Sequence, residues 1–280
     1  MPMIARKNIL EMCLLDDVFM NVMLDEDTNT TGAILRIIMD TPDLIVKDVK
    51  AQSFSQNLEG RSVRFDVKAV DSNGTHYDIE VQKQNDGANP KRVRFNAAMM
   101  DKRLIDSGED WESLPRLCII FITEKDILGG NLPIYHINRK VNEFDCIFDD
   151  QEEVIFVNCE YDDGSIDTDI EKLIHDFKCY EPSKMYLPEL KQKANYYKYV
   201  KEGKQNMSEY IRRVYGEDIA LAAQKAAQQA TEKQLKRDIA RSFDYFSKRL
   251  DEKEAIKVIA EQFELTVPKV KKILNLENDL

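Results

Sequence analysis

The sequence predicts an α/β domain followed by an all-helical region. Residues 63–70 and 76–84 alternate apolar and polar side chains with the two-residue period of half-buried strands. Leu117–Thr123 is a continuous apolar run, which is typical of a strand buried in the centre of a sheet. After residue 188 the apolar residues have helical spacing and strand signals are few.

The break near Pro182 and Pro188 separates these two parts. We therefore expect one domain over residues 1–187 and a helical region over 188–280 with a helix-turn-helix-like end. The helix expected near residue 40 ends at Thr41, because a residue that precedes proline is disfavoured in a helix. In chain order, we expect helices at 4–24, 33–40, 91–107 and 167–180, and further strands at 45–52, 133–137 and 153–159.

Bulk composition excludes several protein classes. The chain has 280 residues, of which 43% are hydrophobic, as in globular proteins. Its apolar stretches fall short of the roughly 20 residues that span a bilayer, and charged residues interrupt the N-terminus, so we expect a cytoplasmic protein without a membrane segment. The five cysteines form no CxxC pair and the three histidines have no ligand spacing, so neither a disulfide framework nor a zinc site is expected.

The formal net charge of −11 is unevenly distributed. Residues 145–189 hold 14 acidic and 3 basic side chains, whereas residues 61–103 hold 9 basic and 6 acidic ones. Local fields, more than net charge, attract a phosphate backbone. The acidic total therefore does not exclude a nucleic acid partner for the basic segment.

The two alternating strands form a hairpin whose register can be predicted. A two-residue Asn73-Gly74 loop would pair Asp66 with Val81 and place a carboxylate beside an apolar residue. A three-residue loop from Ser72, with Gly74 left-handed, pairs Asp66 with Glu80 and keeps the polar residues together. We predict the second register, because the burial pattern fixes register more firmly than turn preference.

This register brings two carboxylates together. Side chains that face each other across a hairpin have Cβ atoms about 5 Å apart, so Asp66 and Glu80 would repel unless a cation lay between them. Carboxylate oxygens are ligands that Mg²⁺ prefers, and the backbone carbonyl of Val81 offers a third. Gln82 follows in the same alternation and could orient a water. The alternative is an ordinary polar strand face in which Arg64 and Lys68 pair with the acids.

Three stretches of the chain resemble one known family. Asp16-Asp17-Val18-Phe19 is similar to its N-terminal Asp-x-x-Phe helix, and RFDVKAVDSNGTHYDIEVQ (64–82) contains its Asp, Asn-Gly turn and Glu-x-Gln. KRVRFNAAMMDKRLIDSGEDWESLPRLCIIFIT (91–123) resembles its Arg-rich helix, Gly-Glu-Asp-aromatic loop and apolar strand. The family is that of the PD-(D/E)XK nucleases described as transposases or recombination-promoting nucleases. The resemblance covers roughly residues 8–180 in order.

The resemblance implies a restriction-endonuclease-like core, with a mixed central sheet flanked by helices, and Mg²⁺-dependent hydrolysis of DNA. It assigns Asp66 and Glu80 as metal ligands and places Gln82 in the position held by lysine in the wider superfamily. A glutamine can position by hydrogen bonding but adds no charge. The source of positive charge stays open: either Lys68, on the same strand face, or Arg94, from the next helix, could compensate.

The other candidate residues leave alternatives open. Asp16 is either an additional acid at the metal or an ordinary helix acid, whereas Lys91, Arg92 and Arg94 either contact DNA phosphates or form a solvated helix face. The C-terminal segment 254–274 is either a DNA-reading helix-turn-helix or a small helical cap, and self-association through the helical region is a further option. For the whole protein, the alternative to an endonuclease is a catalytically silent DNA-binding or assembly protein that retains the fold.

Overall fold

The computed structural model describes residues 8–55, 63–83, 88–144 and 146–276. The chain divides into two compact units, of which the first ends at Tyr215 and the second begins at Gly216. We describe each unit by itself, beginning with the one that contains the sheet.

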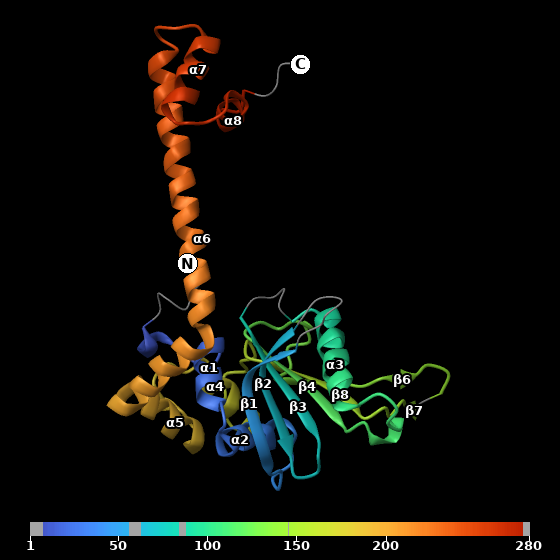
Figure 1. Cartoon of the computed structure of the whole chain (residues 1–280). Helices are drawn as coiled ribbons and strands as arrows, with labels where there is room; N and C mark the ends of the chain where they lie inside the picture. Colours follow the sequence, from blue (N-terminus) through green and yellow to red (C-terminus); the bar gives the residue numbers. More distant parts are fainter. Residues whose placement is uncertain (1–7, 56–62, 84–87, 145, 277–280) are drawn as a thin grey trace. The chain divides into compact units, whose positions relative to one another are not determined.

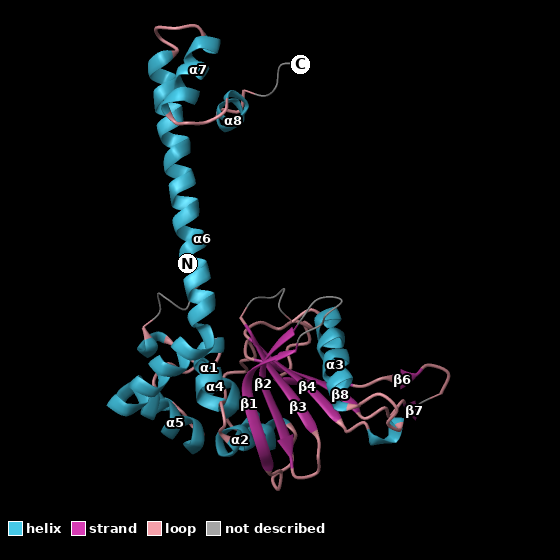
Figure 2. Cartoon of the chain, viewed as in Figure 1, coloured by secondary structure: helices cyan, strands magenta, loops and turns pink. Residues whose placement is uncertain are grey.

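The first unit is built on a six-stranded mixed sheet in the order β1-β2-β3-β4-β8-β5 (Figures 1 and 2). The strands β1, β2 and β3 form an antiparallel meander, β3, β4 and β8 are parallel, and β5 is antiparallel to β8. The strand bounds are β1 Val46–Ser55, β2 Val63–Asp71, β3 His76–Gln82, β4 Leu117–Thr123, β5 Ile134–Ile137 and β8 Glu152–Asn158, and the short strands β6 Lys140–Val141 and β7 Cys146–Ile147 form a separate ribbon.

Helices flank this sheet, as predicted for an α/β core (Figure 2). The helix α3 packs on one face, in a cluster with Phe65, Ile119 and Phe121, whereas α1 and α2 contact β1. In this unit the helices are α1 Asp17–Leu24, α2 Thr28–Ile38, α3 Pro90–Leu104, α4 Asp169–Lys178, α5 Pro188–Tyr199 and the first turns of α6 Lys201–Phe246, with 3₁₀ turns at Ile9–Glu11, Trp111–Ser113 and Pro182–Lys184.

The strand β4 occupies the centre of the sheet, and every one of its residues is buried. It lies between β3 and β8, which pair with it on both edges. This confirms the position predicted from the uninterrupted apolar run Leu117–Thr123, because only a strand covered on both faces tolerates such a sequence.

Two of the expected helices have different limits in the structure. The helix expected at 4–24 is confirmed over Asp17–Leu24 but is not continuous: a 3₁₀ turn ends at Glu11, and α1 begins only after Asp16, which has extended backbone angles. Residues 4–7 of that prediction lie outside the described residues. The helix expected to begin at residue 33 begins at Thr28, because the carboxylate of Asp27 accepts hydrogen bonds from the first free amides of the helix.

The first unit extends past residue 187, where we expected the domain to end. The ammonium group of Lys198, which is fully buried in α5, donates hydrogen bonds to the carbonyls of Met12 and Tyr180, at 2.5 Å each. On the first turns of α6, Tyr215 accepts a 2.9 Å hydrogen bond from Asn21 of α1. These contacts are reasons why the division between compact units falls after Tyr215.

The second unit is helical throughout its described residues. The end of α6 packs with α7 (Glu252–Gln262) and α8 (Val267–Ile273) around Ile239, Ile259 and Val270. Pro268 lies in the first turn of α8, where the lack of an amide hydrogen is tolerated. In the part of the chain that the structure describes, no helix is both long enough and apolar enough to cross a membrane.

Candidate metal centre

The β2–β3 hairpin has the register predicted from its sequence. Val67 pairs with Ile79 and Val70 with His76 in an antiparallel ladder. Gly74 has a φ of 83°, and its amide donates to Asp71 across a three-residue loop. Continued by one position, the ladder places Asp66 opposite Glu80, which confirms the pairing argued from the alternation.

At the Asp66–Glu80 pair, backbone amides donate to carboxylate side chains instead of to backbone carbonyls of the neighbouring strand. The amide of Asp66 donates to Oε1 of Glu80 at 3.2 Å, and the amide of Val81 donates to Oδ2 of Asp66 at 3.2 Å. The other Asp66 oxygen accepts a 3.3 Å hydrogen bond from Gln52 of β1. Two carboxylates thus join the two strands where the backbone ladder ends.

Glu80 is fully buried, and both of its carboxylate oxygens have contacts. Oε1 accepts from Asp66, and Oε2 forms an ion pair of 2.5 Å with Arg92 of α3. The guanidinium is about one third exposed, so it connects the buried acid to the surface. The sequence leaves Arg92 either in contact with phosphates or on a solvated helix face; the structure pairs it with the candidate metal ligand Glu80.

A third carboxyl group, that of Asp78, lies on the same strand and is also fully buried. Its Oδ2 accepts a 3.2 Å hydrogen bond from Asn96 of α3, and its Oδ1 has no hydrogen-bond partner in the described structure. Asp78 therefore adds a buried negative charge next to Asp66 and Glu80 when it is ionised.

Burial shifts the titration of all three acids in the same direction. Loss of solvent raises the pKa of Asp66 to about 6, although the Val81 amide opposes this. Burial, followed by the charge of Asp66, raises the pKa of Asp78 to about 7. Burial and the charges of Asp78 and Asp66 raise the pKa of Glu80 well above its usual value, with Arg92 opposing. Burial is the largest cause of each shift, because removal from water penalises the ionised form of a carboxyl group.

The main-chain geometry adds a third oxygen to this site. The carbonyl of Gln82 accepts from the amide of Glu124, so Gln82 points its backbone toward β4. The backbone groups of neighbouring strand residues point to opposite sides, so those of Val81 point toward β2. The amide of Val81 accordingly donates to Asp66 on β2. Because N–H and C=O of one strand residue face the same side, the Val81 carbonyl also faces β2.

These donors fit a hard divalent cation. Two carboxylates and a carbonyl are oxygen ligands of the kind that Mg²⁺ selects, and water completes such sites. No group of three or more histidine, cysteine or acidic side chains suited to a metal occurs among the residues described. The fit therefore depends on Asp66, Glu80 and the main chain of Val81 together.

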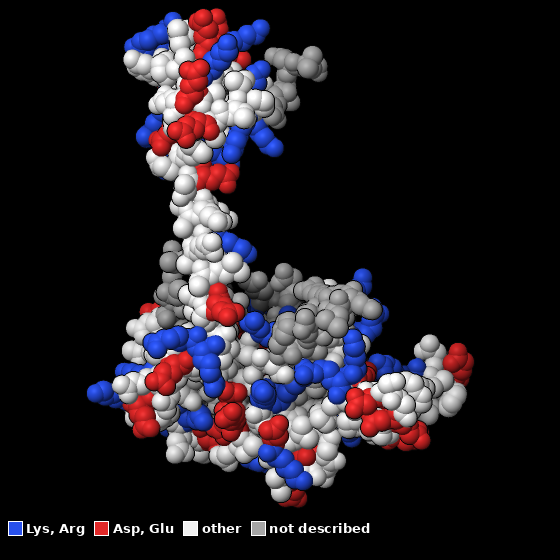
Figure 3. All heavy atoms as spheres, in the orientation of Figure 1, with Lys and Arg blue, Asp and Glu red and all other residues white. Residues whose placement is uncertain are grey.

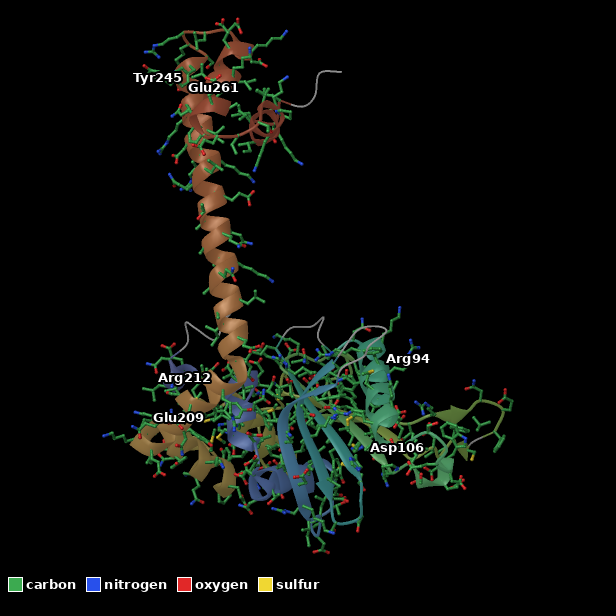
Figure 4. The ribbon with its side chains drawn as sticks, viewed as in Figure 1. Arg94, Asp106, Glu209, Arg212, Tyr245 and Glu261 are labelled. Atoms are coloured by element: carbon green, nitrogen blue, oxygen red, sulfur yellow. The ribbon has the colours of Figure 1, made fainter. Side chains whose placement is uncertain are left out.

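The other residues that the sequence offered as site residues differ in their contacts and in their exposure. Asp16 accepts from the amide of Cys13 at 2.9 Å and pairs with Lys83 at 2.7 Å, so its carboxylate caps a turn. Gln82 is half-buried at the end of β3. Lys91 and Arg94 are exposed on α3, and Arg94 projects from the helix away from the sheet (Figure 4).

Sequence reasoning missed three neighbours of Asp66 and Glu80. Gln52 bonds to Asp66 and has a φ of 51°, which is rare for a residue with a Cβ and has no sequence signal. Asp17, not Asp16, is the helix α1 acid whose charge acts on Asp66. Asp78 was visible in the strand alternation, but its complete burial under α3 was not.

Comparison with known proteins agrees with this arrangement. Residues 45–160, which run from β1 through β8, match the model of the PD-(D/E)XK nuclease family transposases. Over this segment the chain is similar to that family. The match includes the whole β2–β3 hairpin and α3, and it confirms the resemblance noted in the sequence and the nuclease-like character of the domain. No curated protein and no solved structure shows significant similarity to the chain.

Proposed function

We propose that this protein is a Mg²⁺-dependent DNA endonuclease that hydrolyses phosphodiester bonds at the Asp66–Glu80 centre. The observation that carries the proposal is that both carboxylates are held by backbone amides of the two strands where the hairpin ladder ends, with the Val81 amide donating to Asp66. PD-(D/E)XK nucleases generally use divalent cations. The family description also supports a role connected with a mobile element or recombination.

Asp66, Glu80 and the Val81 carbonyl would hold the ion. When bound, it polarises a phosphodiester oxygen and lowers the pKa of a coordinated water. The protein's own groups position the reactants. The amide of Gln82, two residues after Glu80, can accept from and donate to a water, and the exposed Lys91 and Arg94 can contact the DNA backbone.

Arg92 supplies a positive charge that Gln82 lacks. It is held against Glu80 at 2.5 Å, and its side chain remains about one third exposed. A guanidinium can bind a carboxylate and a phosphate at the same time because it presents five N–H donors in a fixed plane. We assign to Arg92 the charge-stabilising role for which the sequence offered either Lys68 or Arg94.

The experiment is nicking of supercoiled plasmid by the purified full chain with Mg²⁺, repeated in EDTA. Wild-type protein should convert the plasmid to nicked or linear forms only with metal, and Glu80→Gln should not. Glu160→Gln is the matched control, because Glu160 is an exposed acid paired with Lys125 and lies outside the site. DNA binding without cleavage under all metals would instead support a catalytically silent DNA-binding protein.

Self-association through the helical C-terminal region stays a prediction of its own. Cutting both strands of a duplex at one place requires two centres, which a pair of chains would provide. Sedimentation equilibrium should then give a mass near twice the 32.5 kDa of the chain, and truncation after Tyr215, the end of the sheet-containing compact unit, should return it to one chain.

A further inference from the structure

Two lysines face each other on neighbouring strands beside the candidate metal centre. Lys50 of β1 pairs directly with Lys68 of β2. Directly opposed side chains point to the same side with Cβ atoms about 5 Å apart, and like charges in such pairs destabilise a sheet. Val49 and Ala51 alternate with Lys50 and are buried, so Lys50 lies on the opposite face, where its side chain is exposed.

A third cation approaches this pair from α3. Arg103, in the last turn of that helix, is close enough for its charge to act on Lys68. The acid that faces Lys68 across the hairpin is Asp78, and Asp48 is two residues from Lys50 on β1. In the view of Figure 3, lysine and arginine side chains gather over the strands of the meander and over α3.

The lysines are not neutralised by ion pairs with the described residues. The ammonium group of Lys68 instead lies over the ring of Phe65, 4.2 Å from its centroid, and Lys50 is exposed. A cation over an aromatic face is held in place while its charge remains available to a second partner. Like-charged groups kept together in this way form a ready site for an anion.

The position of the pair indicates which anion. Lys68 is two residues from Asp66 along β2, a separation of roughly 6.6–6.8 Å between Cα atoms. This is comparable with the distance between neighbouring phosphates of one nucleic acid strand. A strand with one phosphate at Asp66 and Glu80 would therefore bring its next phosphate to the lysines.

We propose that Lys50 and Lys68 form a subsite for the phosphodiester group next to the one held at the metal centre. The inference rests on the proposed nuclease function for the position of the first phosphate. In this arrangement Lys68 positions the DNA strand and is not the replacement for the superfamily lysine.

The test is fluorescence anisotropy of a labelled DNA duplex with the full chain in EDTA, over a series of salt concentrations. Lys50→Gln and Lys68→Gln should each weaken binding by about 3- to 10-fold. Each should also reduce the slope of log K against log salt by about 0.9 for every lost phosphate contact. Lys47→Gln is the matched control, because Lys47 is also an exposed β1 lysine but reaches toward Ser72 at the hairpin turn; it should bind as wild type.

Further variants distinguish a failure of the subsite proposal from a failure of the nuclease proposal. Lys68→Arg should retain binding, which shows that charge rather than strand packing is measured. Unchanged affinity and salt slope in both glutamine variants would overturn the subsite even if the wild type cleaves DNA. Weaker binding of the variants beside a wild type that cuts nothing with Mg²⁺ would support phosphate binding by these lysines and reject the nuclease proposal.

Discussion

Replacing Glu80 with glutamine tests the proposed centre most directly. The change keeps the size of the side chain but removes one of the two carboxylate charges that would hold the ion. The glutamine oxygen can still accept from the Asp66 amide, whereas its NH₂ group would face Arg92, so the guanidinium should turn to solvent. The fold should therefore survive while the metal site loses half its charge.

The expected loss of activity follows from what the ion supplies. If the ion provides several kcal/mol of transition-state stabilisation, loss of about 4 kcal/mol corresponds to a rate about 10³-fold lower. The assay is the initial rate of plasmid nicking at saturating Mg²⁺, with Glu160→Gln as control, together with calorimetric titration of Mg²⁺ into the metal-free protein. A Glu80→Gln rate within a few-fold of wild type would place the chemistry elsewhere and refute the reasoning.

The same variant should not be less stable without metal. A carboxyl group whose folded-state pKa is raised stabilises the protein at a pH below its unfolded value, and that stability is lost as pH rises through the folded value. At neutral pH the buried Glu80 therefore costs stability that glutamine does not. Urea denaturation in EDTA at pH about 7 should show Glu80→Gln equal to or more stable than wild type.

The remaining predictions concern the hairpin and the helix α6. Asp78→Asn should gain stability over wild type as pH rises from about 4 to about 7, by on the order of a few kcal/mol, because burial raises the pKa of Asp78 to about 7; urea midpoints in EDTA across this range measure it. Gln82→Lys should retain or raise cleavage if Gln82 occupies the lysine position, and a rate below one tenth of wild type would contradict that assignment. Gly203→Ala should lower the unfolding free energy by more than about 2 kcal/mol, because its Cβ would overlap the carbonyl of Tyr196, whereas Gly216→Ala in the same helix meets nothing and should add about 0.5–1 kcal/mol by thermal denaturation.

The parts of the fold that were predictable are those with a strong local pattern. The three-residue loop ending at Gly74 and the pairing of Asp66 with Glu80 follow from alternation and turn chemistry, both of which act within twenty residues. The central position of Leu117–Thr123 follows from its uninterrupted apolar sequence. The start of α2 was missed because a single cap residue, Asp27, extends a helix through polar residues that have no apolar period.

The contacts that complete the site come from long-range packing, which local pattern does not encode. Nothing in the run of basic residues on α3 distinguishes Arg92, which pairs with Glu80, from the exposed Arg94. Which of these arginines reaches Glu80 depends on the side of α3 that packs against the sheet. The unusual backbone of Gln52, which brings its amide to Asp66, likewise arises only once β1 is paired with β2.

In the proposed centre, the positive charge comes from α3, a different element from the strand that would carry the lysine of the wider superfamily. A lysine in the position of Gln82 would be fixed to the same strand as Glu80. The next residue, Lys83, is directed to Asp16 instead, at 2.7 Å. Arg92 reaches Glu80 from α3, so charge compensation depends on how the helix packs on the sheet.

The raised pKa values of the three acids depend on how far Arg92 compensates their charge. One guanidinium that is one third exposed cannot offset three carboxyl groups of which two are fully buried. The metal-free centre therefore retains protons near neutral pH, and an ion that binds there must displace them. Metal affinity and proton release are coupled through Asp66, Asp78 and Glu80, so a change in the packing of α3 would alter both at once.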